Sequence, residues 1–321
     1  MKNVLLPERL DALGEGMLEG RVNILRSAGT DERSLCEAAP EADGIVLRSK
    51  ARITEAVLAR APRLRVVSRT GAGIDNIDVD ACTRRGVMVC YLPGVNAYAV
   101  AEHTMALMLA LLKQLPLMDR SVRGGDWAIR AANLPQDAAG KVLGILGLGR
   151  IGREVAARAR VFGMTIIGYD PYVKQVEGVE WAELDDVVAR ADVLTLHLPE
   201  SAATRRIIDA GRIARMKRTA YIINASRGGI VDAGALAQAL QDKRIAGAAL
   251  DVFDGEPPAA GDPLLRLDNV ILTPHVAALT KQCGAVMMRE AVGRLLTALE
   301  GGTPPGMANA EALMDGGRRL E

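Results

Sequence analysis

Short apolar segments alternate with stretches of helical periodicity along almost the whole chain. Each apolar segment is short enough to be a strand, and each interval that follows is long enough for a helix. This pattern is typical of βαβ units, in which parallel strands are buried between two layers of helices. It therefore predicts an α/β fold with parallel sheets covered on both faces.

The alternation forms two series, and 321 residues suffice for about two domains. The first series ends near Asn96, a long apolar helix is expected at about 97–115, and Gly140 opens the second series. A helix at 281–299 is expected to cross back to the first domain. Two helices at the boundary predict a hinge, with a ligand cleft between the domains. The expected strands are 3–6, 21–25, 44–47, 65–68 and 87–90, then 142–146, 165–169, 193–196, 220–223, 246–250 and 270–272.

Composition excludes several classes of function. Forty Lys plus Arg balance thirty-nine Asp plus Glu, so the net charge of +1 creates no global field for nucleic acid or an anionic membrane. Aromatic residues make up 3% of the chain, and no segment has the roughly 18 to 20 apolar residues of a membrane span. The four cysteines follow no disulfide or metal-binding spacing. We expect a soluble cytoplasmic protein with reduced thiols, no metal and no nucleic-acid partner.

A glycine-rich motif follows the strand expected at 142–146. Gly147, Gly149 and Gly152 have G-x-G-x-x-G spacing at the start of a helix. The first glycine permits a tight turn, the second lets a pyrophosphate approach the backbone, and the third allows close helix packing. The free N–H groups of the helix N-terminus can bind phosphate oxygens. The motif therefore predicts a dinucleotide site in a doubly wound, Rossmann-like sheet.

The cofactor preference depends on Asp170, which ends the next strand eighteen residues after Gly152. A carboxylate there accepts hydrogen bonds from the ribose hydroxyls of NAD and repels the 2′-phosphate of NADP. We therefore expect NAD. Lys174 is close enough in sequence to keep NADP open as an alternative.

Only three histidines are candidates for a proton carrier. His103 lies in an apolar helix and is expected to be structural. His197 ends a strand where a Rossmann sheet presents residues to its cofactor, and with Pro199 it is expected to line the cofactor site. His275 follows the strand at 270–272, at the sheet edge where chemistry occurs. We therefore predict that His275 is the proton donor.

Two further strand-end loops supply charged partners for His275. Glu256 can stabilise the protonated imidazole, and the planar fork of Arg227 can bind a carboxylate and polarise the adjacent carbonyl. A surface ion pair is the commoner role of a single charged residue. Because Arg227, Glu256 and His275 lie on three loops at equivalent positions of the sheet, a shared catalytic role is favoured instead.

These residues lie in motifs that together resemble the D-isomer-specific 2-hydroxyacid dehydrogenases, most closely the phosphoglycerate dehydrogenase branch without a regulatory domain. The motifs are GKVLGILGLGRIGREVA, GYDPY, NASRGGIVD, AALDVFDGEPP and TPH in the cofactor half, with LRSK, GAGIDNIDV and VNAYAVAEHT outside it. The resemblance covers nearly the whole chain. One departure is Val276-Ala277-Ala278 after TPH, where relatives commonly have glycine.

The resemblance implies both the domain organisation and the site. It implies two doubly wound, Rossmann-like domains with a cleft between them: a substrate domain from 1–96 and 281–321, and an NAD-binding domain at 97–280. It also implies a homodimer built largely on the cofactor domain. The implied catalytic set is Arg227, Glu256 and His275, and the implied cofactor contacts are Arg150, Ile151, Asp170, Ala225, Ser226 and Asp251.

The substrate is the least determined part of the site. The resemblance implies that Arg48, Ser49 and Asn96 bind the distal charge of 3-phosphoglycerate or 3-phosphohydroxypyruvate, and Arg69 can add charge. Backbone N–H groups of Gly71, Ala72 and Gly73 can bind the substrate carboxylate. The alternative is that Arg48 and Arg69 pair with Asp75 or Asp78. Reduction of hydroxypyruvate, glyoxylate or another 2-oxo acid therefore remains an alternative, as does an NAD-sensing binding protein. Feedback through an appended effector domain is not expected.

Overall fold

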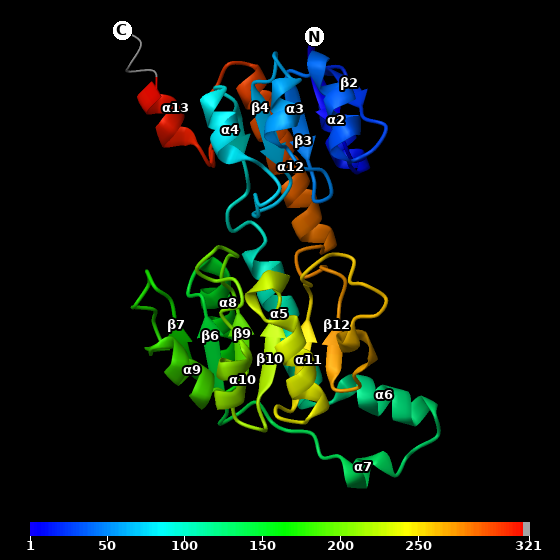
Figure 1. Ribbon diagram of the computed structural model, residues 1–321, viewed down its shortest axis with the longest axis vertical. Helices are drawn as coiled ribbons and strands as arrows, with labels where there is room; N and C mark the ends of the chain where they lie inside the picture. Colours follow the sequence, from blue (N-terminus) through cyan, green and yellow to red (C-terminus); the bar gives the residue numbers. More distant parts are fainter. Residues whose placement is uncertain (317–321) are drawn as a thin grey trace. The chain divides into compact units, whose positions relative to one another are not determined.

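The computed structural model describes residues 1–316 and divides the chain into two compact units (Figure 1). Unit 1 combines Met1–Asn96 with the segment that begins at Thr280, and unit 2 is Ala97–Leu279. Residues 317–321 of the expected 281–321 segment lie outside the described residues. Each unit contains one parallel sheet, which confirms the expected α/β class.

Unit 1 has a five-stranded sheet in the order β2-β1-β3-β4-β5. Its strands are β1 (Lys2–Leu6), β2 (Val22–Arg26), β3 (Gly44–Leu47), β4 (Val66–Arg69) and β5 (Met88–Cys90). Its helices are α1 (Ala12–Leu18), α2 (Glu32–Ala38), α3 (Glu55–Ala59), α4 (Val79–Arg84), α12 (Lys281–Leu299) and α13 (Ala310–Gly316).

Alternate residues of these strands point to opposite faces of the sheet, and each face has its own core. Leu5, Ile45 and Val67 pack with the α2, α3 and α4 side. Val46 and Val66 pack against α12, whose buried face supplies apolar side chains such as Leu295. The chain therefore completes the first domain with its C-terminal part.

Unit 2 has a seven-stranded parallel sheet. Its strands are β6 (Val142–Leu146), β7 (Thr165–Tyr169), β8 (Glu180–Trp181), β9 (Val193–Leu196), β10 (Tyr221–Asn224), β11 (Gly247–Leu250) and β12 (Val270–Leu272). Its helices are α5 (Ala97–Leu112), α6 (Leu115–Arg123), α7 (Ile129–Ala132), α8 (Arg150–Val161), α9 (Leu184–Arg190), α10 (Ala210–Arg215) and α11 (Ala233–Gln241). The strand order β12-β11-β10-β9-β6-β7-β8 reverses direction between β6 and β9, which is the switch point where such sheets bind ligands.

The sequence predicted six of these strands and missed β8. A two-residue edge strand is too short to produce a recognisable apolar run.

The core of unit 2 lies on both faces of the sheet, with α5 and α8 on one face and α9, α10 and α11 on the other. Among residues 1–316, no helix has both the length and the apolar composition of a membrane span.

The single helix expected at 97–115 is wrong in its extent. α5 ends at Leu112, Gln114 adopts a left-handed φ of 52°, and α6 begins at Leu115 with a proline in its first turn. Proline lacks an N–H group and clashes with the preceding turn, so it starts a new helix more readily than it continues one. Figure 1 shows α6 and α7 extending from the body of unit 2.

Candidate active site

The glycine-rich turn between β6 and α8 is shaped by contacts that only glycine permits. Gly147 has a φ of 99°, and a Cβ there would lie 2.6 Å from the carbonyl oxygen of His197. A Cβ on Gly152 would collide with the carbonyl oxygen of Gly147. A Cβ on Gly149, in contrast, would meet open space. Gly149 is the N-cap of α8 and provides no capping side chain, so the first N–H groups of the helix can bind an anion.

Asp170 joins the end of β7 to this turn. Its Oδ2 accepts a hydrogen bond from the Leu148 N–H at 2.8 Å. Its Oδ1 accepts hydrogen bonds from the N–H groups of Tyr172 at 2.8 Å and Val173 at 3.0 Å. A carboxylate has about four acceptor positions, so one remains for a ribose hydroxyl. Lys174 places its Nζ 4.8 Å from the centre of the Trp181 ring, where the ring attracts the ammonium group.

His197 lies where β9 ends, beside the glycine-rich turn. Its Nε2 is 3.0 Å from Thr195 Oγ1, and its buried Nδ1 has no hydrogen-bond partner within residues 1–316. Burial lowers the pKa of His197 to about 3, so the ring is neutral at physiological pH. A neutral ring nitrogen without a partner, on a residue whose backbone contacts Gly147 of the glycine-rich turn, fits a polar group of a bound dinucleotide. The glycine turn, Asp170 and His197 would hold NAD here.

Arg227 follows β10, on a loop that Asn224 organises. Asn224 Oδ1 accepts hydrogen bonds from the backbone N–H of Ser226 at 3.1 Å and from its hydroxyl at 2.9 Å. Asn224 Nδ2 donates to the Arg227 carbonyl oxygen at 2.8 Å. A Cβ on Gly228 would collide with the backbone of Phe253, so this loop lies directly against the loop that carries Glu256. Asn224 was not among the predicted site residues, although its position at a strand end is a recognisable signal.

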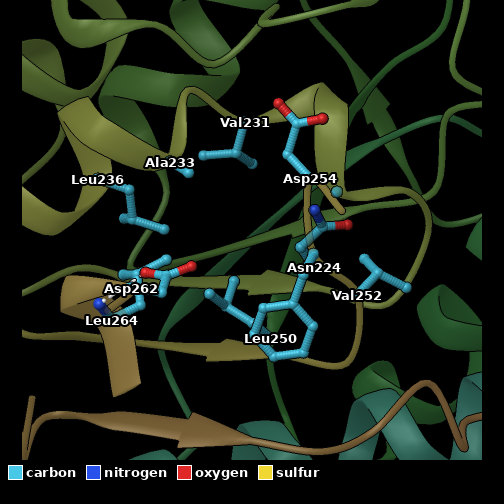
Figure 2. A pocket seen from close by; sticks show the side chains of 11 residues that line it. Asn224, Val231, Ala233, Leu236, Leu250, Val252, Asp254, Asp262 and Leu264 are labelled. Atoms are coloured by element: carbon cyan, nitrogen blue, oxygen red, sulfur yellow. Dashed lines mark hydrogen bonds between the residues drawn. The ribbon is translucent and has the colours of Figure 1, made fainter. Parts of the chain in front are cut away.

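Behind the Arg227 loop is a cavity of about 40 Å³ (Figure 2). Asn224, Asp254 and Asp262 contribute polar groups, and Val231, Ala233, Leu236, Leu250, Val252 and Leu264 are among its apolar lining residues. This volume accommodates a water molecule or two but is far too small for a dinucleotide. The cavity is therefore not the cofactor site.

Glu256 and His275 form a direct pair. Glu256 Oε2 lies 2.7 Å from His275 Nδ1, and Glu256 Oε1 accepts a hydrogen bond from the Phe253 N–H at 3.2 Å. The side chains of Glu256 and His275 are 37% and 48% exposed, so both can reach a ligand. Since Nδ1 faces the carboxylate, Nε2 is the ring nitrogen that can exchange a proton with a substrate oxygen.

The backbone around His275 is held by Asp251, at the end of β11. His275 has a left-handed φ of 53°, which is uncommon for a residue with a side chain. The Asp251 carbonyl accepts the His275 N–H at 2.7 Å, and the fully buried Asp251 carboxylate accepts the N–H groups of Val276 and Ala277, each at 2.9 Å. Burial alone would raise the pKa of Asp251, but hydrogen bonds, including those from His103 and Thr273, outweigh burial and lower it. Ala277 also packs against Ala225, which follows β10.

The expected substrate residues lie in unit 1, at the carboxyl edge of its sheet. Arg48 and Ser49 follow β3 and are exposed, and Arg69 ends β4. Arg48 Nη1 donates to the Arg9 carbonyl oxygen at 2.9 Å, and Arg69 Nη1 donates to the Thr70 carbonyl oxygen at 2.9 Å. The turn of Gly71, Ala72 and Gly73 follows β4, and the buried Oδ1 of Asn96 has no hydrogen-bond partner in the described part of the chain. The expected ligand cleft between these residues and the catalytic set of Arg227, Glu256 and His275 stays a prediction.

The chain is similar to known proteins over most of its length. Residues 105–277 match the model of the NAD-binding domain of the D-isomer-specific 2-hydroxyacid dehydrogenases. A D-3-phosphoglycerate dehydrogenase from Methanocaldococcus jannaschii is 42% identical over 287 residues, which is 88% of this chain and 54% of that protein. The chain spans about half the length of the curated relatives it matches.

Solved structures of related proteins have the same fold. D-Lactate dehydrogenase from Aquifex aeolicus, complexed with NAD and lactic acid, has a TM-score of 0.86 and 29% identity, covering 94% of this chain and 96% of that one. An NADPH-dependent glyoxylate/hydroxypyruvate reductase from Sinorhizobium meliloti, in complex with citrate, has a TM-score of 0.87 and 28% identity, covering 97% of this chain and 99% of that one.

Proposed function

Because this chain belongs to the D-isomer-specific 2-hydroxyacid dehydrogenase family, we propose that it interconverts a D-2-hydroxy acid and its 2-oxo acid with NAD. The observation that carries the proposal is the 2.7 Å pair of Glu256 and His275. This pair lies on loops that contact the Arg227 loop, within the unit that contains the glycine-rich turn. Carbonyl reduction requires a proton donor, a cationic group that binds the substrate carboxylate, and a site for the dinucleotide.

The glycine-rich turn, Asp170 and His197 would hold NADH, which would supply the hydride for C2 of the 2-oxo acid. Arg227 binds the substrate carboxylate and polarises the C2 carbonyl. His275 Nε2 donates a proton to the carbonyl oxygen, which becomes the hydroxyl group of the product. Glu256 stabilises the positive charge of His275 before the transfer and orients the ring during it. In the direction of oxidation His275 accepts the same proton.

We further propose 3-phosphoglycerate and 3-phosphohydroxypyruvate as the substrate pair. The Methanocaldococcus relative carries this activity in its name, and the carboxyl edge of unit 1 presents Arg48 and Arg69. Two guanidinium groups suit a substrate with a phosphate group. The Sinorhizobium reductase supports hydroxypyruvate or glyoxylate as the alternative.

The test is an NADH-oxidation screen of the full chain with phosphohydroxypyruvate, hydroxypyruvate, glyoxylate, pyruvate and 2-oxoglutarate. The highest kcat/KM is expected for phosphohydroxypyruvate, and Arg48→Ala should reduce that value while leaving hydroxypyruvate turnover nearly unchanged. An equal loss of kcat/KM with both substrates would contradict a phosphate-binding role for Arg48. NADH binding without turnover of any 2-oxo acid would instead support the binding-protein alternative.

We also propose a homodimer that uses the segment around α6 and α7. All residues of these helices are exposed or half-buried, and the segment exposes large apolar side chains: Leu115 (54%), Val122 (52%), Trp127 (67%) and Leu134 (75%). Apolar side chains gathered on a projecting segment are typical of a protein interface.

A reducing compartment such as the cytoplasm fits the four free thiols, three of which are buried.

A further inference from the structure

His103 is linked to the His275 loop by a chain of hydrogen bonds that the proposed reaction does not use directly. His103 lies on α5, and its Nε2 is 3.1 Å from Thr273 Oγ1 and 3.5 Å from Asp251 Oδ1. Thr273 Oγ1 in turn lies 2.6 Å from Asp251 Oδ1. Three elements separated widely in sequence therefore meet at one hydroxyl group.

The direction of these hydrogen bonds follows from the chemistry of each group. An ionised carboxylate only accepts, so Thr273 must donate its single hydroxyl proton to Asp251. Thr273 Oγ1 can then only accept from His103, which requires the proton of the imidazole to be on Nε2. The result is a directed series of hydrogen bonds from His103 through Thr273 to Asp251, and the same Nε2–H group also faces Asp251 Oδ1 directly at 3.5 Å.

Asp251, the last member of this series of hydrogen bonds, binds the backbone that carries the proton donor. Asp251 binds the N–H groups of Val276 and Ala277 through its carboxylate and that of His275 through its carbonyl. A left-handed φ costs a residue with a side chain roughly 1–2 kcal/mol, so His275 keeps it only because the surroundings enforce it. The Asp251 carboxylate is fully buried, whereas the His103 side chain is 22% exposed.

We propose that His103 is a positioning residue for the proton donor: through Thr273 and Asp251 it holds residues 275–277 in the conformation that pairs His275 with Glu256. This inference rests on the proposed dehydrogenase function. His103 touches neither Glu256 nor His275 directly, and its effect is on the orientation of the donor. A loosened loop would leave cofactor binding intact while lowering the rate of proton transfer.

The first experiment compares variants that interrupt the hydrogen bonds from His103 to Asp251 with variants that preserve them. His103→Leu and Thr273→Val remove one hydrogen-bonding group each, whereas His103→Gln and Thr273→Ser keep a donor or a hydroxyl in place. We expect the first two to lower kcat roughly tenfold or more with a nearly unchanged KM for NADH, and the second two to recover most of the rate. The double variant should lose little more than either single one, because both interrupt the same chain. Additive losses would overturn the proposal.

Thr104→Val is the matched control. Thr104 is the next residue of α5, is 1% exposed, and hydrogen-bonds only to the Val100 carbonyl among the contacts of its side chain in the described structure. It should keep the wild-type kcat. If Thr104→Val lowers kcat as much as His103→Leu does, the effect is a general disturbance of α5 and the proposal is wrong.

A second experiment needs no turnover and therefore separates failure of this inference from failure of the proposed function. The chain has three histidines, so three imidazole spin systems can be assigned by substitution in long-range ¹H–¹⁵N spectra. His103 should carry its proton on Nε2, and the ring signals of His275 should change in His103→Leu and return in His103→Gln. Unchanged His275 signals together with unchanged kcat in His103→Leu would overturn the inference. If His275→Ala kept full activity, the proposed reaction would fail whatever these spectra show.

Discussion

Glu256 Oε2 lies 2.7 Å from His275 Nδ1, although the two residues are nineteen positions apart in sequence. They are neighbours because Glu256 follows β11 and His275 follows β12, and these adjacent parallel strands end at the same edge of the sheet. Asp251 binds the backbone of the second loop and so keeps this geometry.

His275→Ala should lower kcat by roughly a hundredfold to ten-thousandfold, the usual contribution of general acid catalysis, while NADH binding is retained. Glu256→Gln should cause a smaller loss, because the amide can still accept a hydrogen bond but does not stabilise the charged ring. Steady-state rates and NADH titration measure both effects. Glu300→Gln, on an exposed residue of unit 1 paired with Arg21, is the control and should behave as wild type. Full activity of His275→Ala would exclude it as the proton donor.

Arg227→Ala should reduce kcat/KM by roughly a hundredfold or more with little change in NAD affinity, because a charge-assisted bidentate contact to the substrate carboxylate is lost. Arg227→Lys should recover only part of the loss, since an ammonium group lacks the planar fork. Arg218→Ala is a matched control, because exposed Arg218 precedes β10 at the opposite edge of the same sheet. Equal effects of the Arg227 and Arg218 substitutions would contradict the assignment.

NAD should bind more tightly than NADP, because the Asp170 carboxylate would repel a 2′-phosphate. Asp170→Asn should narrow this difference by removing the charge while keeping one acceptor oxygen. Asp170→Ala should narrow it too, but should also weaken NAD binding, because the hydrogen bond to Leu148 in the glycine-rich turn is lost. Fluorescence titration with both cofactors measures these affinities. Equal wild-type affinities would disprove the predicted preference.

Asp192 should contribute to stability in a pH-dependent way. Burial alone would raise its pKa, but hydrogen bonds from Lys217 Nζ and the Val142 N–H, each 2.8 Å long, outweigh burial and lower it. A lowered folded pKa means that the stabilisation is present above the ordinary value of about 4 and is lost as the pH falls through the folded value.

We therefore expect Asp192→Asn to reduce the free energy of unfolding by about 1–2 kcal/mol at neutral pH, measured by urea unfolding. The difference from wild type should shrink below about pH 4. Asp137→Asn, at an exposed ion pair with Lys113, should have no measurable effect. A difference for Asp192→Asn that is the same at pH 3 and pH 7 would contradict the argument.

Trp127→Ala combined with Leu134→Ser should weaken the proposed homodimer, because both side chains add apolar area to the exposed segment around α7. Sedimentation velocity over a range of protein concentrations measures the change. Leu13→Ser, at a 37% exposed residue of unit 1, is the control and should leave the assembly unchanged. A wild-type protein that sediments as a monomer at all concentrations would disprove the proposed dimer.

The fold class could be predicted because its causes are local in the sequence. Buried parallel strands need apolar runs, and the turn at Gly147 and Gly152 needs glycine whatever surrounds it. The break between α5 and α6 could also have been predicted, since a proline in the first turn of α6 is visible in the sequence. β8 could not, because two residues provide no periodicity.

The sequence by itself determined which residues stand at strand ends, and therefore which charged groups could meet at one edge of each sheet. Only the tertiary structure decided how they pair. Asp170 binds the glycine-rich turn, and Thr273 after β12 joins His103 on α5 to Asp251 after β11, across more than half of the chain. The physical reason is that strand order and periodicity are local properties of a sequence, whereas a buried carboxylate takes whichever donors the folded chain brings within hydrogen-bond distance.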